Sequence, residues 1–317
     1  MSRGIKVLWI VIGSLFAAGV FLSVAGYAFG GTGRAWFDRD GLHFGQRVAQ
    51  TYEIADLNSE QFDYATIELI EANVELVPAS SYGYKLSYTG YREPSIEVSR
   101  GELNELRIRG ESDTWHIGMD FLPWDLFDHH AMLTIYVPSD ATLDSINLYT
   151  VSGSSSLQGN DVRARHVNYR SASGSVDLKA LTLEQLVIDV ASGDVRLENV
   201  SAKGATFEMI SGRLDYNQGT VDSLVLDMVS GRISFKGTVT SGLSVHTVSG
   251  DADLELTGSE DAYSLALNRV SGDVRVNGRL VNDSALPSST STGGDGNAAG
   301  NITIDTISGS VNIVFDE

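Results

Sequence analysis

Three carboxylate side chains recur at the same place in an internal repeat. Asp189, Glu208 and Asp227 lie 19 residues apart, and each precedes a Ser-Gly pair by three residues. If the repeats stack as neighbouring β-strands, these side chains form one column with about 4.8 Å between them. Like charges at that distance can hold a cation or a basic ligand, which makes the three residues candidate binding residues. The simpler interpretation is that they point into water at a cost of about a few tenths of a kcal/mol.

Other side chains in the same column are polar or charged as well. In sequence order the column consists of Tyr149, Arg170, Asp189, Glu208, Asp227, His246, Asn268 and Asp305. A polysaccharide-acting enzyme on a β-helix would need carboxylates and basic groups gathered in one groove, and this column does not assemble such a cluster. The sequence therefore predicts surface pairing more readily than catalysis.

Motifs with an established chemistry do not occur in the sequence. The six histidines have no metal-type spacing, and the chain contains no cysteine, which excludes a disulfide scaffold, a thiolate metal site and a cysteine nucleophile. A Gly-x-Ser-x-Gly elbow, a P-loop and a calcium-binding nonapeptide are also lacking. We predict no catalytic residue, no metal site and no cofactor, and hence a protein that is not an enzyme.

An aromatic stretch between residues 115 and 127 is the second candidate binding region. It contains Trp115, Phe121 and Trp124. Aromatic side chains on an exposed loop could contact a partner, a glycan or a membrane surface. The alternative is that they form a hydrophobic lid over one end of the fold.

An internal repeat must position these residues. Ser-Gly occurs at intervals of 21, 19, 19, 19, 19, 22 and 37 residues, starting with the serines Ser152, Ser173, Ser192, Ser211, Ser230, Ser249, Ser271 and Ser308. The last interval is one repeat plus an insertion, residues 282–300, whose polar composition predicts a flexible loop. A fixed period of this kind is typical of a solenoid.

The apolar residues of each repeat show its strand pattern. Positions six, four and one before the serine are apolar, as in Leu224, Leu226 and Val229, and so are positions three and five after it. Alternation on both sides predicts a strand, a Ser-Gly corner and a second strand, because glycine tolerates a positive φ at a corner. Eight such rungs, stacked in parallel, predict an all-β parallel β-solenoid. A two-layer antiparallel sandwich would not explain the fixed period.

The region before the repeats is β in character but irregular. Residues 67–76 resemble a rung with a shortened corner, and further strands are expected at 84–88, 103–109 and 132–137. We assign residues 34–140 to an irregular N-terminal β cap and residues 141–317 to the solenoid. The chain ends two residues after Phe315, so we expect an open stack end that the insertion or a partner covers.

The first 33 residues predict a membrane anchor. The stretch from Val7 to Phe29 carries no charged residue and is long enough to cross a membrane. Arg3 and Lys6 precede it, which places the N-terminus in the cytoplasm and the remainder outside the cell membrane. Ser23-Val24-Ala25 resembles a cleavage site, so a cleaved signal peptide is the alternative.

Net charge excludes one class of partner. The formal charge of −19 argues against nucleic acid, because phosphate binding requires clustered lysine and arginine. An acidic, lysine-poor surface is explained most simply as the solubilising charge of an exposed domain.

The chain resembles the bacterial putative-adhesin family of unknown function, including the LiaG-like envelope proteins, from about residue 50 to the end. The resemblance depends on Leu-Thr-Ile-Tyr-Val-Pro at 133–138, Val-Ser-Gly at 151–153, and Ser-Gly-Asp-Val at 192–195 and 271–274. It implies a β-solenoid attached to the cell envelope and implies no reaction.

Together these features predict a membrane-anchored envelope protein that binds a protein or a cell-wall component. Two alternatives stay open. One is a polysaccharide-acting β-helix enzyme, and the other is a structural polymer formed by end-to-end association of solenoids.

Overall fold

The computed structural model describes residues 35–38, 41–44, 50–71, 73–90, 96–110, 130–158, 163–281 and 300–316. The chain divides into two compact units. Unit 2 comprises residues 53–88, 94–111 and 130–317, and unit 1 comprises residues 1–52, 89–93 and 112–129. In the described ranges the fold is all-β, with two short 3-10 turns as its only helical segments.

No helix in the described part of the chain is long and apolar enough to cross a membrane. The predicted membrane segment, residues 7–29, lies outside the described residues, as do Trp115, Phe121 and Trp124.

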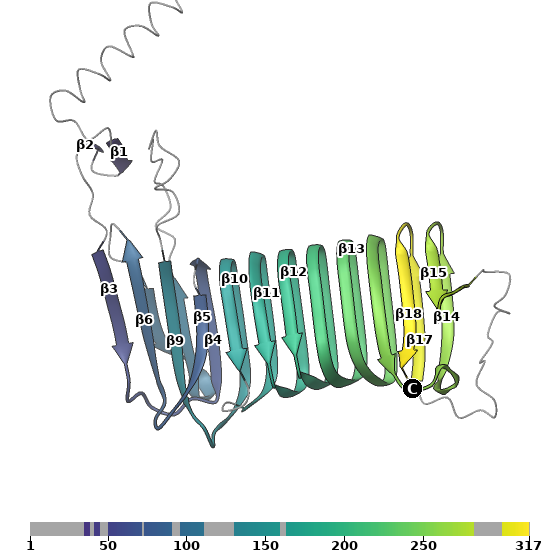
Figure 1. Ribbon diagram of the computed structural model, residues 1–317. Coiled ribbons are helices and arrows are strands. Elements are labelled where there is room, and N and C mark those ends of the chain that lie inside the picture. The colour runs from purple at the N-terminus through teal and green to yellow at the C-terminus, as the bar shows by residue number, and fades with distance from the viewer. Residues whose placement is uncertain are drawn as a thin grey trace, which may run out of the picture. The chain divides into compact units, whose positions relative to one another are not determined.

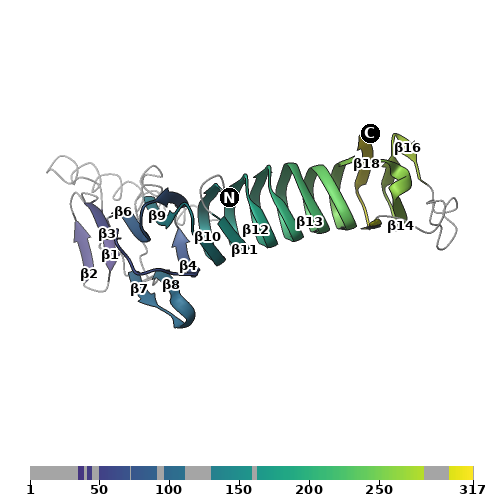
Figure 2. The same ribbon diagram turned by 90° about the horizontal axis from the view of Figure 1, so that it is seen from below.

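The Ser-Gly repeats form parallel rungs of a solenoid. β10 (Thr142–Gln158), β11 (Arg163–Lys179) and β12 (Thr182–Glu198) are one rung each. β13 (Ser201–Thr257) has 57 residues and continues through three further rungs. In Figure 1 each rung runs up to a tight bend and back, and Figure 2 shows the rungs following one another along the solenoid.

Neighbouring rungs pair in the register that the repeat predicts. Ser152 pairs with Ser173, Ser173 with Ser192, and Ser192 with Ser211. The Ser-Gly pair divides every rung into two parts, which we call the leading layer before the serine and the trailing layer after it. The predicted parallel solenoid is therefore confirmed for these repeats.

Apolar side chains of both layers fill the space between them. The positions six and four before the serine are almost all buried, as predicted, and so is the position two before it, which holds Val190, Met209 and Met228. Where that position holds serine or threonine, the hydroxyl groups pair along the stack, as in Thr247 and Thr306 with 3.0 Å between their Oγ1 atoms. The position just before the serine is also apolar, but its larger side chains are exposed on the outside of the rung.

Glycine is required at several corners by the close approach of successive rungs. A Cβ atom on Gly193 would lie 1.8 Å from the carbonyl oxygen of Gly174. A Cβ on Gly212 would lie 2.0 Å from the oxygen of Gly193, and Gly212 also has a φ of +124°. Backbone conformation, which the sequence analysis invoked, is thus only part of the reason for glycine.

The solenoid continues into the region before the repeats. β4 (Tyr64–Glu71) and β5 (Asn73–Ala79) form the next rung beyond β10, which confirms the rung predicted at 67–76. β8 (Glu105–Gly110) then pairs with β4, and β9 (His130–Pro138) pairs with β5. The two halves of this next rung therefore come from two separate segments of the chain. β8 and β9 also confirm two of the three expected strands.

β3, β6 and β7 belong to the same sheet as the stack, whereas β1 and β2 form a separate two-stranded sheet. Beyond β9 the order is β6, then β3, whereas β7 pairs with β8 in the antiparallel sense and β1 pairs with β2. Their bounds are β1 Ala35–Asp38, β2 Gly41–Phe44, β3 Gln50–Asp56, β6 Gly83–Gly90, β7 Ile96–Arg100 and the 3-10 turn η1 Glu102–Asn104. β6 confirms the third expected strand.

At the other end of the solenoid the rungs do not follow the order of the sequence. The last rung of β13 pairs with β17 (Gly300–Thr306) and β18 (Ser310–Asp316). β14 (Tyr263–Arg269) and β15 (Asp273–Val276) pair with the opposite edges of β17 and β18. The C-terminal rung therefore lies inside the stack, and the rung that precedes it in sequence is terminal (Figure 1).

This order corrects the expectation that the C-terminal rung is the open end. The physical reason is β16 (Arg279–Leu280), which pairs with β15 in the antiparallel sense. It occupies the edge of β15 that an inner rung would need for its next neighbour. A rung with that edge occupied can only be terminal. Gly300, assigned to the insertion from the sequence, is the first residue of β17.

Candidate functional site

The outward face of the leading layer carries the predicted column of polar residues. In spatial order this charged column consists of Tyr149, Arg170, Asp189, Glu208, Asp227, His246, Asp305 and Asn268. Glu68 and then Arg109 continue it beyond Tyr149. Asp305 comes before Asn268 because the C-terminal rung lies inside the stack, which reverses the order predicted from the sequence.

The structure brings the three predicted carboxylates together but also supplies partners at both ends. Arg170 Nε lies 3.9 Å from an oxygen of Asp189. At the other end, His246 Nδ1 lies 2.5 Å from Asp227 and His246 Nε2 lies 3.0 Å from Asp305. Glu208, between them, has no ion-pair partner within the described ranges. The column is therefore partly neutralised.

A metal ion fits this column poorly. Among the described residues, no group of three or more His, Cys, Asp or Glu side chains is arranged to hold one. Contacts with Arg170 and His246 stabilise Asp189 and Asp227 without a metal ion. Binding of a ligand at Asp189, Glu208 and Asp227 remains a proposal.

A row of exposed apolar side chains runs beside the charged column. This apolar stripe is the position just before each serine: Val151, Ala172, Ala191, Ile210, Val229, Val248, Ile307 and Val270. Its six larger members are between 42% and 80% exposed. The sequence could have predicted this exposure. Residues two apart in a strand face the same side, so the position one before the serine faces outward with the column three before it.

The stripe is hollowed where its side chains are smallest. Ala172 and Ala191 lie in an open groove of about 470 Å³ whose apolar lining also includes Leu69 and Val151. Neither alanine fills the space that Ile210 or Val229 fills farther along the stripe. The groove therefore arises from two alanines in consecutive rungs.

Charged and aromatic groups form the rim of this groove. Arg109 Nε donates to Glu68 Oε2 at 2.8 Å, and the Arg170 guanidinium lies 5.9 Å from the centre of the Tyr149 ring. Asp189 completes the rim. An apolar floor with a rim of guanidinium, carboxylate and phenol groups can bind a ligand that has one apolar face and several polar substituents, such as a sugar or an extended peptide.

A second hollow, of about 430 Å³, lies on the trailing layer. Lys236 and Glu255 face each other there, and their hydrogen bond raises the pKa of Lys236. The apolar residues that line this hollow, Tyr216, Phe235 and Leu254, are almost fully buried, so it offers a ligand less exposed apolar surface than the groove on the leading layer. The leading layer is therefore the better candidate.

Solved structures from several bacteria match most of this chain at low sequence identity. A putative adhesin from Bacteroides fragilis is 14% identical, over 86% of this chain and 100% of that chain, with a TM-score of 0.45. A putative lipid binding protein from Parabacteroides distasonis is 16% identical, over 85% and 97%, with a TM-score of 0.42. A putative cell adhesion protein from Clostridium sporogenes is 12% identical, over 84% and 100%, with a TM-score of 0.31. No curated protein matches the chain in sequence.

A family model matches most of the chain. The model is Toastrack DUF4097, and the match extends over residues 64–314, from the first residue of β4 into β18. The resemblance to the putative-adhesin family is thereby confirmed, while the nearer likeness to LiaG-like envelope proteins stays a prediction. The chain belongs to the Toastrack DUF4097 family.

Proposed function

We propose that this protein is a non-enzymatic, membrane-anchored protein of the cell envelope, and that its solenoid binds a protein or a cell-wall component through the leading layer. The observation that carries the proposal is the groove at Ala172 and Ala191, where an exposed apolar floor meets a charged and aromatic rim. Exposed apolar stripes bordered by polar groups mark interaction sites more often than solvated surface.

The anchor and the topology rest on the sequence alone. The uncharged stretch from Val7 to Phe29 and the positive charges before it favour a single span with the solenoid outside. A cysteine placed at Ser289 tests this, because the natural chain has none. Labelling of intact cells by a membrane-impermeant maleimide would support the outward topology. Labelling after lysis, but neither in intact cells nor after permeabilisation of an outer membrane, would contradict it.

Filling the groove tests the binding site. The Ala191→Trp substitution places a large ring among the groove residues, and Arg196→Trp adds the same ring to the trailing layer of the same rung as a matched control. We expect the wild type and Arg196→Trp to co-sediment with purified cell-wall sacculi, and the bound fraction to fall at least about fivefold for Ala191→Trp. A fivefold loss of affinity corresponds to about 1 kcal/mol of binding free energy.

The result also separates the two classes of partner. If the wild type does not sediment with sacculi, the cell-wall part of the proposal is wrong. A photo-crosslinking residue at position 191 in intact cells then tests for a protein partner, with position 196 as its control. Equal adducts at both positions, or adducts at neither, would contradict binding at the groove. The rim of the groove does bring together carboxylates and basic groups, as a polysaccharide-acting enzyme would require, so turnover of acidic polysaccharides by the wild type would favour the enzyme instead.

A further inference from the structure

The C-terminal rung fills a slot between two other rungs. Residues 242–257 of β13 form one side of the slot, and β14 with β15 form the other. In the described part of the chain, these two sides have no backbone pairing with each other. The slot is thus one rung wide. Without β17 and β18, the backbone groups that face the slot on both sides would have no strand to pair with.

The two sides of the slot are tied together independently of the inserted rung. The chain passes from one side to the other through Gly258, which has a φ of +121°, and the 3-10 turn η2 (Glu260–Ala262). Tyr263 also donates a hydrogen bond of 2.6 Å from its hydroxyl to the Val239 carbonyl oxygen. These links keep the sides near the separation that a strand requires.

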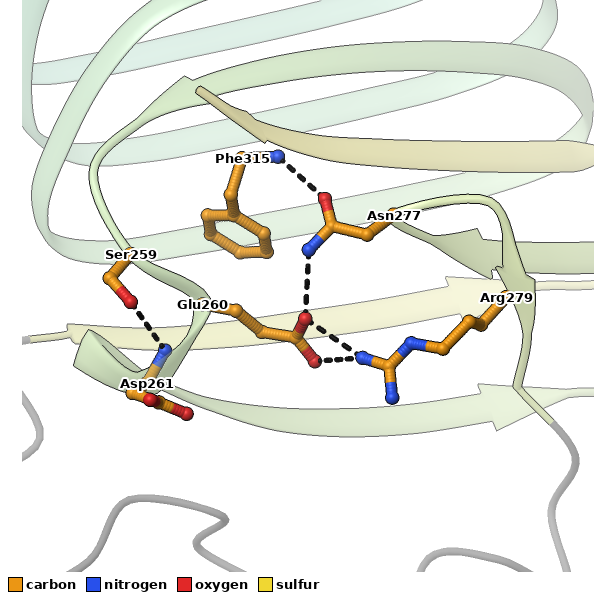
Figure 3. A network of polar contacts seen from close by, with 6 residues as sticks. All are labelled: Ser259, Glu260, Asp261, Asn277, Arg279 and Phe315. Atoms are coloured by element: carbon orange, nitrogen blue, oxygen red, sulfur yellow. Dashed lines mark hydrogen bonds and ion pairs between the residues drawn. The ribbon is translucent and has the colours of Figure 1, made fainter. Parts of the chain in front are cut away.

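The terminal rung also makes stabilising contacts with the connection through η2. Figure 3 shows the Glu260 carboxylate between Asn277 and Arg279, which donate to it at 2.8 Å and 2.7 Å. The Asn277 side chain then accepts a hydrogen bond of 3.0 Å from the Phe315 backbone nitrogen. The acceptor for the C-terminal strand is therefore a group held in place by residues outside that strand.

The inserted rung is held by contacts on both edges and on its inner face. Backbone hydrogen bonds join Ser308 N to Val248 O at 2.8 Å on one edge and Ser271 N to Ile307 O at 2.8 Å on the other. Ile304 is fully buried between the layers. All of these contacts are made between the inserted rung and the slot, and none involves the segment that joins them. The same strand from another copy could therefore make the same contacts.

We propose that the slot is a strand-binding site, and that in a strand-exchanged dimer it binds residues 300–316 of a second copy. The 18 residues at 282–299 that precede the strand can extend to about 60 Å, many times the spacing of two rungs. Such a connection permits the strand to fill the slot of its own chain or that of a neighbour. Both sides of the slot precede the strand in the sequence and are synthesised first, so the slot can accept the strand of either chain.

Disulfide trapping tests this proposal, since the natural chain contains no cysteine. Ser244 and Thr303 pair directly across one edge of the slot. Paired residues of adjacent strands lie within the range that a disulfide spans. One chain carries Ser244→Cys, a second chain with a different tag carries Thr303→Cys, and the two are produced together. We expect a reducible heterodimer that contains both tags.

The control is Val225→Cys, which is the same position one rung earlier. Two rung spacings, about 9.6 Å, exceed the disulfide range, so we expect at least about tenfold less heterodimer with Thr303→Cys. A Ser244→Cys/Thr303→Cys double variant reports the filling of the slot within one chain. If the double variant closes its disulfide and the mixed chains give no heterodimer, exchange is refuted. If the double variant forms no disulfide between positions 244 and 303, either within a chain or between chains, the slot itself is overturned.

Discussion

Glycine is needed in this solenoid for two reasons, crowding by a neighbouring rung and a positive φ, and four glycines allow the two to be measured separately. Gly193 has an ordinary φ, but an added Cβ would lie 1.8 Å from a backbone oxygen. Gly258 has a φ of +121° with no atom within 4 Å of the added Cβ. Gly212 combines a φ of +124° with a 2.0 Å approach, and Gly242 has neither, because its nearest atom is 3.9 Å away. Alanine at each position therefore measures crowding and backbone strain separately.

The expected magnitudes follow from these geometries. At Gly193 the backbone must move by more than about 1 Å, and because rungs lie on both sides we expect a loss near the upper end of about 1–3 kcal/mol. Gly258→Ala should cost about 1–3 kcal/mol of backbone strain. Gly212→Ala should cost about the sum of the two. Gly242→Ala should be neutral or stabilise by up to about 1 kcal/mol, because alanine reduces the entropy of the unfolded chain.

Urea unfolding of the four variants and the wild type, followed by far-UV circular dichroism, provides the free energies of unfolding. We expect the order Gly242→Ala, then Gly258→Ala and Gly193→Ala, then Gly212→Ala, from most to least stable. If Gly193→Ala were as stable as Gly242→Ala, close stacking would not be the reason for glycine at the corner. If Gly258→Ala were neutral, the strain assigned to positive φ would be wrong.

Three further predictions concern the core and the terminal rung. Ile304→Ala should lower the free energy of unfolding by about 2–5 kcal/mol, whereas Val314→Ala, 39% exposed on the same rung, should lower it by less than about 1 kcal/mol in the same urea assay. Burial raises the pKa of Tyr216, so unfolded chains lose this proton first and stability should fall as the pH rises above about 10. Thermal scans across that range should show a smaller fall for Tyr216→Phe, and an equal fall would contradict the assignment. Arg279→Ala removes an exposed ion pair with Glu260 and should change global stability by less than about 1 kcal/mol, but hydrogen exchange should become faster in β15 and β16.

The repeat could be predicted from the sequence because its causes are local. A period of 19 residues, apolar residues at alternate positions and glycine at one corner determine the rung, its register and its buried positions. The shortened rung at β4 and β5 could be found by the same rule. The apolar stripe was also within reach, since strand parity alone places Val229 on the side of Asp227 and away from Leu226.

The candidate groove depends on side chains from segments far apart in the chain. Ala172 and Ala191 belong to neighbouring repeats, but Glu68 and Arg109 come from β4 and β8, and their place beside Tyr149 follows from pairings across long stretches of sequence. Residue types at a fixed spacing could not reveal this rim. The predicted column of Asp189, Glu208 and Asp227 was correct in register. The position of Asp305 next to His246, however, could not be predicted from the spacing of the repeats.

The sequence by itself determined what one rung looks like and which of its faces is buried. Only the tertiary structure decided the order in which the last two rungs stack. Both orders bury the same kinds of side chain, because Leu265 and Ile302 occupy equivalent positions in the repeat. The deciding feature is β16, which occupies the outer edge of β15 and leaves only the inner place to the C-terminal rung. His246 meets Asp305 for that reason, since a strand edge can be hydrogen-bonded to only one neighbour.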